Sequence, residues 1–175
     1  NSIYASDTSL NSFNLGEIVC LDTNGNKKIN YLVNDKIRTT PSMDYRGNMY
    51  LTNGVNLNSF TSSGAPLFSE IQLGGLSFVT PTIDSVLDRM YSGVSNKKFF
   101  ALDLKNKGEV KWDFTADAPI SAPAVVSAGR KLIFTDVSGK LYGFDVSTSL
   151  LPKTGNGPKW KHQILMDSIL LAPSL

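Results

Sequence analysis

The sequence predicts an all-β protein built from repeated four-stranded antiparallel sheets, the blades of a β-propeller. Three observations lead to this fold class. A unit of about 40 to 45 residues recurs along the chain, which is the signature of a repeat architecture. Within each unit, short stretches rich in Val, Ile, Phe, Tyr and Leu alternate with turns of Gly, Asn, Asp and Ser, which is a strand pattern. No window carries a sustained amphipathic stripe of helical period and length.

Each unit opens on a proline, which we place at the start of the innermost strand of a blade. These prolines recur about every 40 to 50 residues, at Pro41, Pro81, Pro123 and Pro173. Proline is tolerated at the first residue of a strand, because its missing N–H removes no hydrogen bond from the ladder there.

Three further strands follow each proline in a fixed order. The second strand is GNMYL, DRMYS or KLIFT, with NSIYA at the start of the chain as the matching part of an earlier copy. The third strand is an apolar stretch that usually ends on aspartate, seen as EIVCLD, NLNSFT, KFFALD and KLYGFD. The outermost strand follows a glycine turn and carries Trp112 or Trp160 in the last two units. Each unit is therefore expected to be one twisted sheet that buries both faces against its neighbours.

This alignment gives four blades' worth of sequence. The expected units are approximately 1–33, 39–72, 79–115 and 121–164, with the first strand of a further blade at 169–175. Because the chain starts at Asn1 rather than Met and inside a blade, we expect a segment of a propeller of seven or eight blades. Two alternatives remain open: residues 169–175 close a four-bladed ring beside residues 3–6, or a second copy of the chain completes an eight-bladed ring.

The segment ALDLKNKGEVKW, from Ala101 to Trp112, resembles the Ala-x-Asp-x-x-Thr-Gly-x-x-x-Trp docking motif of the PQQ-type propeller repeat. Quinoprotein dehydrogenases share this repeat with non-enzymatic relatives such as the periplasmic propeller lipoprotein of outer-membrane protein assembly. The segment differs from the motif by one extra residue between Asp103 and Gly108 and by lysine or asparagine in place of threonine. The copy that ends at Trp160 has a glycine in place of the alanine and a longer insertion. The resemblance implies a propeller of about seven or eight blades.

The residue types of this motif favour a structural role. A tryptophan offers a large flat face that fills the wedge between adjacent blades, and a small residue such as Ala101 leaves room for it. Asp103 stands at a strand end before the turn at Gly108, where a carboxylate caps backbone N–H groups. We therefore expect Ala101, Asp103, Gly108, Trp112 and Trp160 to hold the blades together.

Residues suited to catalysis or to metal binding form no constellation in the sequence. The single histidine, His162, falls on an outer strand, and the single cysteine, Cys20, falls on an apolar strand that suits a buried thiol. The stretch DTNGN (22–26) lacks the later acidic ligands of a calcium loop and is expected to be a turn. No match exists to the calcium and quinone ligands or the cysteine pair of quinoprotein dehydrogenases. We therefore predict no catalytic residue, metal site or cofactor.

The charge and the hydropathy of the sequence argue against nucleic acid as a partner and against a membrane span. Lys plus Arg number 17 and Asp plus Glu 15, a net charge of +2 that is far from the dense basic surface of a nucleic-acid binder. No run of 18 or more apolar residues occurs, so no membrane-spanning helix is expected. We therefore expect neither nucleic acid nor a membrane span.

The loops from each outermost strand to the next innermost strand gather at one mouth of a propeller, where binding residues are commonly found. These loops are residues 34–39, 73–78, 116–121 and 166–168. Arg38 can make forked hydrogen bonds, and Leu76 and Phe78 are apolar anchors, so we predict a partner face there. In the alternative interpretation, Phe78 fills a gap between blades and Arg38 pairs with an aspartate.

These features favour a non-enzymatic binding or scaffold propeller that presents a loop face to a protein or polymer partner. The resemblance implies a bacterial protein located outside the cytoplasm, in the periplasm, at the cell surface or secreted. In the alternative, the chain is part of a quinoprotein dehydrogenase or another secreted enzyme whose active groups lie outside it. A third interpretation is the extracellular propeller of a sensor.

Overall fold

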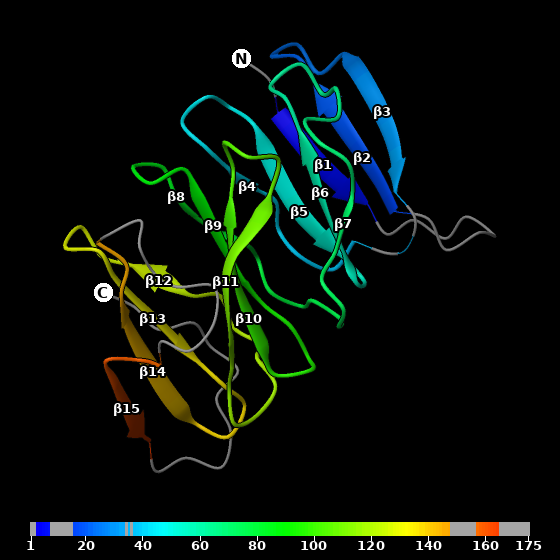
Figure 1. The fold of residues 1–175 in the computed structure, drawn as a ribbon. Coiled ribbons are helices and arrows are strands. Elements are labelled where there is room, and N and C mark those ends of the chain that lie inside the picture. Colours follow the sequence, from blue (N-terminus) through cyan, green and yellow to red (C-terminus); the bar gives the residue numbers. More distant parts are fainter. Residues whose placement is uncertain (1–2, 8–15, 34, 36, 148–156, 165–175) are drawn as a thin grey trace.

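Four antiparallel sheets follow one another in chain order in the computed structural model of the protein (Figure 1). The structure describes residues 3–7, 16–33, 35, 37–147 and 157–164. The first sheet contains β1 (Ile3–Asp7), β2 (Gly16–Leu21) and β3 (Lys27–Val33). The second contains β4 (Ser42–Met43), β5 (Met49–Asn53), β6 (Asn56–Phe60) and β7 (Ile71–Gln72). The third contains β8 (Thr82–Asp84), β9 (Arg89–Gly93), β10 (Lys98–Asp103) and β11 (Glu109–Thr115).

The fourth sheet contains β12 (Val125–Val126), β13 (Lys131–Thr135), β14 (Lys140–Asp145) and β15 (Trp160–Gln163). Every sheet is a meander, in which each strand pairs with the one before it in the chain. None of the described residues is helical. The all-β fold with four-stranded antiparallel blades is therefore confirmed, while the strand expected at 169–175 lies outside the described residues.

A hairpin turn that recurs in the sheets explains the Asp-x-x-Gly pattern of the sequence. In the turn of residues 44–48, the carbonyl of Asp44 accepts the amide of Gly47 at 3.0 Å, and the Asp44 carboxylate accepts the amides of Arg46 and Asn48, both at 2.9 Å. Gly47 has a φ of 79°, a conformation that costs an L-residue energy and glycine almost none. The oxygen-rich stretch 22–26 forms the same turn around Asp22, as expected.

Successive sheets pack face to face, and each interface has its own apolar core. Ile18 lies with Leu51 and Phe60 between the first and second sheets, and Tyr50 with Met90 between the second and third. Between the third and fourth sheets the core is largely aromatic, with the rings of Phe99 and Phe134 stacked at a centroid distance of 3.9 Å. Burial of one such side chain stabilises the fold by roughly 1.5–3 kcal/mol.

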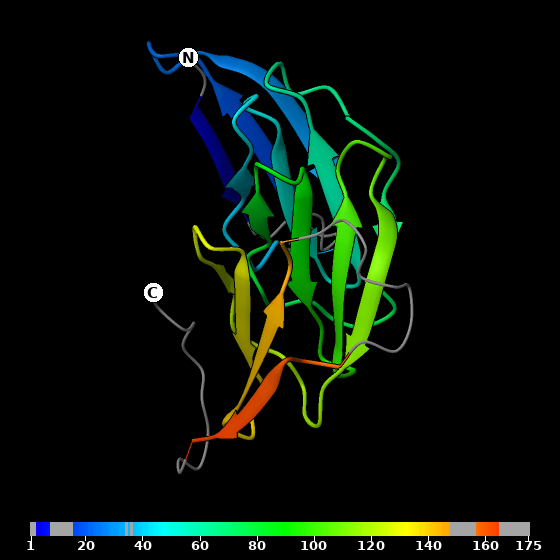
Figure 2. The same cartoon turned by 60° about the vertical axis from the view of Figure 1, so that its left-hand side comes forward.

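Hydroxyl groups tie the innermost strands of neighbouring sheets together. The residue after the proline supplies the hydroxyl in each case: Ser42 donates to the carbonyl of Pro81, and Thr82 donates to the carbonyl of Ala124, the latter at 2.7 Å. These bonds hold the inner edges of the second, third and fourth sheets in line. Seen from a second direction, the first sheet and β15 lie at opposite ends of the row of sheets (Figure 2).

Candidate partner-binding face

The connections between sheets lie on one side of the molecule, where they bond to the central hairpin turns of the sheets. Ile37 forms a β-bridge with Asn53, and the amide of Ser77 donates to the carbonyl of Gly54 at 2.8 Å. The carbonyl of Leu76 in turn accepts the amide of Ser95, also at 2.8 Å. We call this side the connection side. Its loops are held by the sheets they join, so they form a fixed platform.

Three apolar side chains of the connection side are exposed to solvent and define an apolar patch. Leu76 is 44% exposed and Phe78 41%, both in the connection from β7 to β8. Val55 is 38% exposed and lies in the turn between β5 and β6, directly after Gly54. Sequence reasoning proposed Leu76 and Phe78 but missed Val55, although a large apolar residue in a tight turn was a usable signal. Exposed apolar groups on a rigid platform are the usual centre of a protein-binding surface.

Arg38 belongs to a different connection, from β3 to β4, but reaches the same patch. Its guanidinium carbon lies 6.0 Å from the centre of the Phe78 ring, a cation–π distance. Among the residues that the structure describes, Arg38 forms no ion pair with an aspartate, so the interpretation of Arg38 as a structural salt-bridge residue does not hold there. The three residues predicted for a partner face, Arg38, Leu76 and Phe78, therefore all lie exposed on the connection side.

The third connection, residues 116–121, differs because its polar groups are used internally. The buried carboxylate of Asp136 accepts the hydroxyl of Tyr142 at 2.7 Å and the amide of Ala118 at 3.1 Å. Burial of Asp136 opposes its ionisation, but hydrogen bonds from Ser138 and Tyr142 outweigh burial and lower its pKa. Asp117 is paired with Lys140. This part of the connection side therefore offers fewer free groups to a partner.

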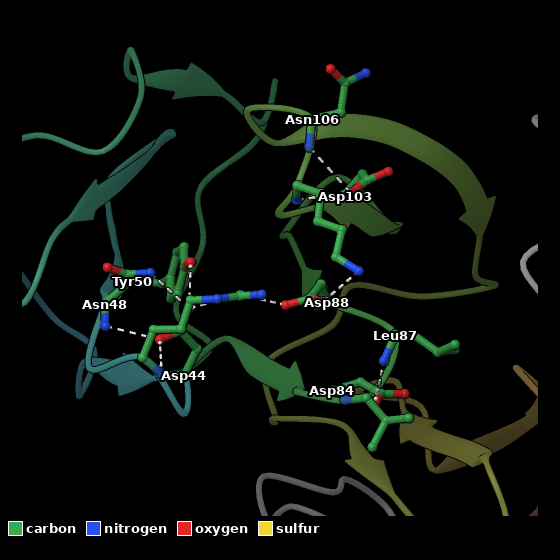
Figure 3. A network of polar contacts seen from close by, with 11 residues as sticks. Asp44, Asn48, Tyr50, Asp84, Leu87, Asp88, Asp103 and Asn106 are labelled. Atoms are coloured by element: carbon green, nitrogen blue, oxygen red, sulfur yellow. Dashed lines mark hydrogen bonds and ion pairs between the residues drawn. The ribbon is translucent and has the colours of Figure 1, made fainter.

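The opposite side of the molecule carries a polar network that links the second and third sheets (Figure 3). Arg46, in the turn after β4, donates to Asp88 at 2.5 Å, and Lys105 lies 2.9 Å from the same carboxylate. The hydrogen bond from Arg46, followed by that from Lys105, lowers the pKa of Asp88 despite its burial. These contacts join the turns of the second and third sheets. The charges of Arg46, Lys105 and Asp88 therefore stabilise the contact between these sheets and are already paired.

A second ion pair on this side joins the third and fourth sheets. The guanidinium of Arg130 donates to the buried carboxylate of Asp84. Burial acts to raise the pKa of Asp84, yet hydrogen bonds from Arg130 and from the amides of Leu87 and Val86 lower it overall. The pKa of Tyr91 shifts in the opposite direction: burial of its phenol raises it to about 12. None of these groups is poised to exchange a proton near neutral pH.

Trp112 lies in the interface between the third and fourth sheets and is only 3% exposed. It pairs across the strands with Ala101, and its ring stacks on Phe144 of the next sheet at a centroid distance of 5.2 Å. Asp103 accepts the amide of Lys105 at 2.9 Å, and Gly108 has a φ of 75° in the turn that follows.

Trp160 occupies the matching place in the fourth sheet, since it pairs with Gly143 as Trp112 pairs with Ala101. A Cβ atom on Gly143 would lie 2.1 Å from the indole ring, so the ring rests directly on the glycine. Trp160 is 45% exposed because no described residue beyond the fourth sheet covers it. Both tryptophans thus lie on a small residue of the neighbouring strand, and among the described sheets Trp112 has a further sheet to pack against.

Groups with catalytic or metal-binding chemistry are dispersed over the described part of the chain. His162 is exposed on β15, and the thiol of Cys20 is buried and free. No three His, Cys, Asp or Glu residues gather within metal-binding distance in the ranges that the structure describes. Those ranges also contain no helix of a length and hydropathy suited to crossing a membrane.

Comparison with known proteins identifies the fold but no family. No protein-family model and no curated protein matches the chain. The crystal structure of BamB from Moraxella catarrhalis is similar, with a TM-score of 0.70 and 16% identity over 94% of this chain and 51% of BamB. The WD40 repeats of RRP9 are similar as well, with a TM-score of 0.63 and 13% identity over 77% of this chain and 41% of theirs. The chain therefore has the β-propeller fold and spans about half the length of BamB.

Proposed function

We propose that the protein is a non-enzymatic scaffold that binds a protein partner on the connection side. The observation that carries this proposal is the apolar patch of Val55, Leu76 and Phe78, which is exposed on a platform fixed by backbone hydrogen bonds. Arg38, whose guanidinium lies over the ring of Phe78, adds a forked donor at the rim of the patch. An aromatic, a leucine and an arginine together form the type of cluster that dominates the energy of protein interfaces.

We also propose a repeat family and a blade number for the propeller. The paired small residue and tryptophan in the third and fourth sheets support assignment to the PQQ-type repeat, with blade units near 1–33, 39–72, 79–115 and 121–164. In this proposal the four units are part of a ring of seven or eight blades. On the basis of the resemblance to that repeat, we also propose a location outside the cytoplasm of a bacterium, where the partner would be found.

The experiment is a pull-down from an extract of the source organism with the wild type and the double variant Arg38→Ala/Leu76→Ser. We expect the double variant, folded by circular dichroism, to lose the partner. The matched control is Lys28→Ala/Val86→Ser, which removes an exposed cation and an exposed apolar side chain away from the apolar patch. Equal recovery by the wild type and the Arg38→Ala/Leu76→Ser variant would contradict the proposed face.

A further inference from the structure

We infer that the segment bound by the connection side is acidic as well as apolar, with carboxylates placed beside apolar side chains. This inference rests on the proposed function and specifies the chemistry of the partner. It follows from the charges around the apolar patch, which can be divided into those that the fold already uses and those that it leaves available.

Most cations of the described structure are paired with a carboxylate. Near the connection side, Lys98 pairs with Asp113, and Lys140 and Lys161 share Asp117. On the opposite side, the cations of the polar network pair in the same way. A paired cation has little to offer a partner, because binding would have to replace an existing contact.

Two cations beside the apolar patch form no such pair among the described residues. Arg38 contacts the ring of Phe78, which leaves the N–H groups at the edge of its guanidinium free to donate. Lys97 is exposed in the turn between β9 and β10, next to Asn96, whose amide donates to the carbonyl of Gly74 in the patch connection at 2.9 Å. Arg38 therefore brings unneutralised positive charge to Phe78, and Lys97 brings it to the turn that is bonded to the connection of Gly74 and Leu76.

The backbone of Lys97 fixes the point from which its side chain leaves the turn. Its φ is 73°, in the left-handed region where a non-glycine residue is strained, and its carbonyl accepts the amide of Ala116 at 2.8 Å. Glycine fills this position in the corresponding turn of the fourth sheet, at Gly139, and in two other hairpin turns with the same backbone hydrogen bond, at Gly47 and Gly25. A lysine here costs some stability relative to glycine and presents an exposed cation in the turn that is bonded to the patch connection.

The carboxylate of Asp35 lies beside Gly54, next to Val55 of the patch, and forms no ion pair with Arg38 or Lys97. Its side chain packs on Gly54, where a Cβ atom would lie 2.1 Å from the carboxylate oxygen, and it has an interaction of its own. Arg38 and Lys97 are left as the free charges at the rim. A carboxylate on the guanidinium edge forms the strong, charge-assisted type of hydrogen bond, while apolar side chains beside it cover Leu76 and Phe78.

Four fluorescein-labelled peptides of twelve residues test the inference by fluorescence anisotropy. One alternates Asp with Phe and Leu, a second has Lys in place of Asp, a third has Ser in place of Asp, and a fourth keeps Asp but has Ala in place of Phe and Leu. We expect the first to bind at least about tenfold more tightly than the other three at low salt and to weaken as salt is added. Failure of the first peptide to bind better than the serine peptide would overturn the inference.

Variants of the protein test whether Arg38 and Lys97 cause the preference for the acidic peptide. Arg38→Ala and Lys97→Ala should each weaken the acidic peptide about three- to tenfold and leave the serine peptide unchanged, while Lys28→Ala, which removes an exposed cation of β3, should have no effect. Arg38→Glu/Lys97→Glu should reverse the preference toward the lysine peptide. If Leu76→Ser weakens every peptide alike and the charge variants do nothing, the partner face stands and its acidic specificity is wrong. If the Arg38→Ala/Leu76→Ser variant also retains the cellular partner, the proposed face itself is wrong.

Discussion

Ala101 and Trp112 face each other across β10 and β11, and this pair shows how a single small residue shapes an interface. A larger side chain at position 101 would occupy the space in which the indole lies, between its own sheet and Phe144. The indole N–H of Trp112 has no acceptor among the described residues, so the contact depends on apolar stacking. Trp112 therefore stabilises the interface through the shape and apolar surface of its ring and not through a hydrogen bond.

Trp112→Ala should lower the free energy of unfolding by roughly 3–5 kcal/mol, because it leaves a cavity in the aromatic core between two sheets. Trp112→Phe should cost less, since it keeps a ring for Phe144 and loses no hydrogen bond. Trp160→Ala is the matched control and should cost about 1 kcal/mol or less, because half of that ring already faces water. Urea unfolding measures all three, and a Trp112→Ala loss under about 1 kcal/mol would contradict the packing role.

Arg46→Ala should make the stability of the protein less sensitive to acid. The hydrogen bonds from Arg46 and Lys105 hold the pKa of Asp88 below its ordinary value of 3.8. A carboxyl whose pKa is lower in the folded state stabilises the fold above its unfolded pKa, and this stabilisation is lost as the pH falls through the folded value. We therefore expect the wild type to be more stable than Arg46→Ala at pH 7 and the difference to shrink below about pH 4.

The measurement is urea unfolding of both proteins at pH 7 and at a series of acidic pH values, together with an NMR titration of Asp88. Lys28→Ala provides a control in which an exposed cation without an ion pair among the described residues is removed. A difference between wild type and Arg46→Ala that stays constant across this pH range would show that Arg46 acts only through packing on Tyr45, whose ring lies 4.3 Å from its guanidinium carbon.

At the scale of single elements, the conformation of each turn glycine predicts how much stability a Gly→Ala substitution costs. Gly25 has a φ of 83° with open space around it, so Gly25→Ala introduces backbone strain alone, about 1–2 kcal/mol. Gly47→Ala should cost more, because its φ is 79° and the new Cβ would lie 3.2 Å from the Cβ of Ser62. Gly157→Ala, in open space without a positive φ, should stay within about 0.5 kcal/mol. Thermal unfolding that ranks the three variants differently would contradict this account.

The strands and turns were predictable because each has a local cause. Pro81 precedes β8, the Asp44 and Asp22 turns follow from one sequence pattern, and the apolar stretches give β9 and β10 their two buried faces. The β-bulge between Ala101 and Leu102 opposite β11 was not foreseen. Its cause lies in the pairing with another strand, which no local pattern contains.

The candidate face was predictable in part for the same reason. A propeller fold fixes on which side the connections lie, so Arg38, Leu76 and Phe78 could be proposed once the repeats were aligned. The contact of Arg38 with Phe78 joins two connections about 40 residues apart, and Val55 enters through a hairpin turn of a third segment. Such a contact depends on how sheets are placed relative to one another, and this placement comes from the packing of whole faces.

At the scale of the whole molecule, the outer face of the fourth sheet resembles the faces that pack between sheets. Trp160 lies over Gly143 as Trp112 lies over Ala101, yet no described residue stacks on its outer surface. If a further blade covers this face in the assembled ring, Trp160 should become as protected as Trp112. The two tryptophans of the chain thus report on the interior and on the end of the row separately.

Acrylamide quenching of tryptophan fluorescence tests this expectation. In the present chain, we expect one quenchable and one protected tryptophan, and the Trp160→Phe variant should retain only the protected one, because Trp112 is 3% exposed and Trp160 45%. The converse variant, Trp112→Phe, should retain only the quenchable emission. When adjoining blades are supplied by a longer chain or by a second copy, the quenchable component should disappear, since an added sheet would stack on Trp160 as Phe144 stacks on Trp112. Quenching of Trp160 that is unchanged in the larger assembly would show that the next blade does not dock on this face.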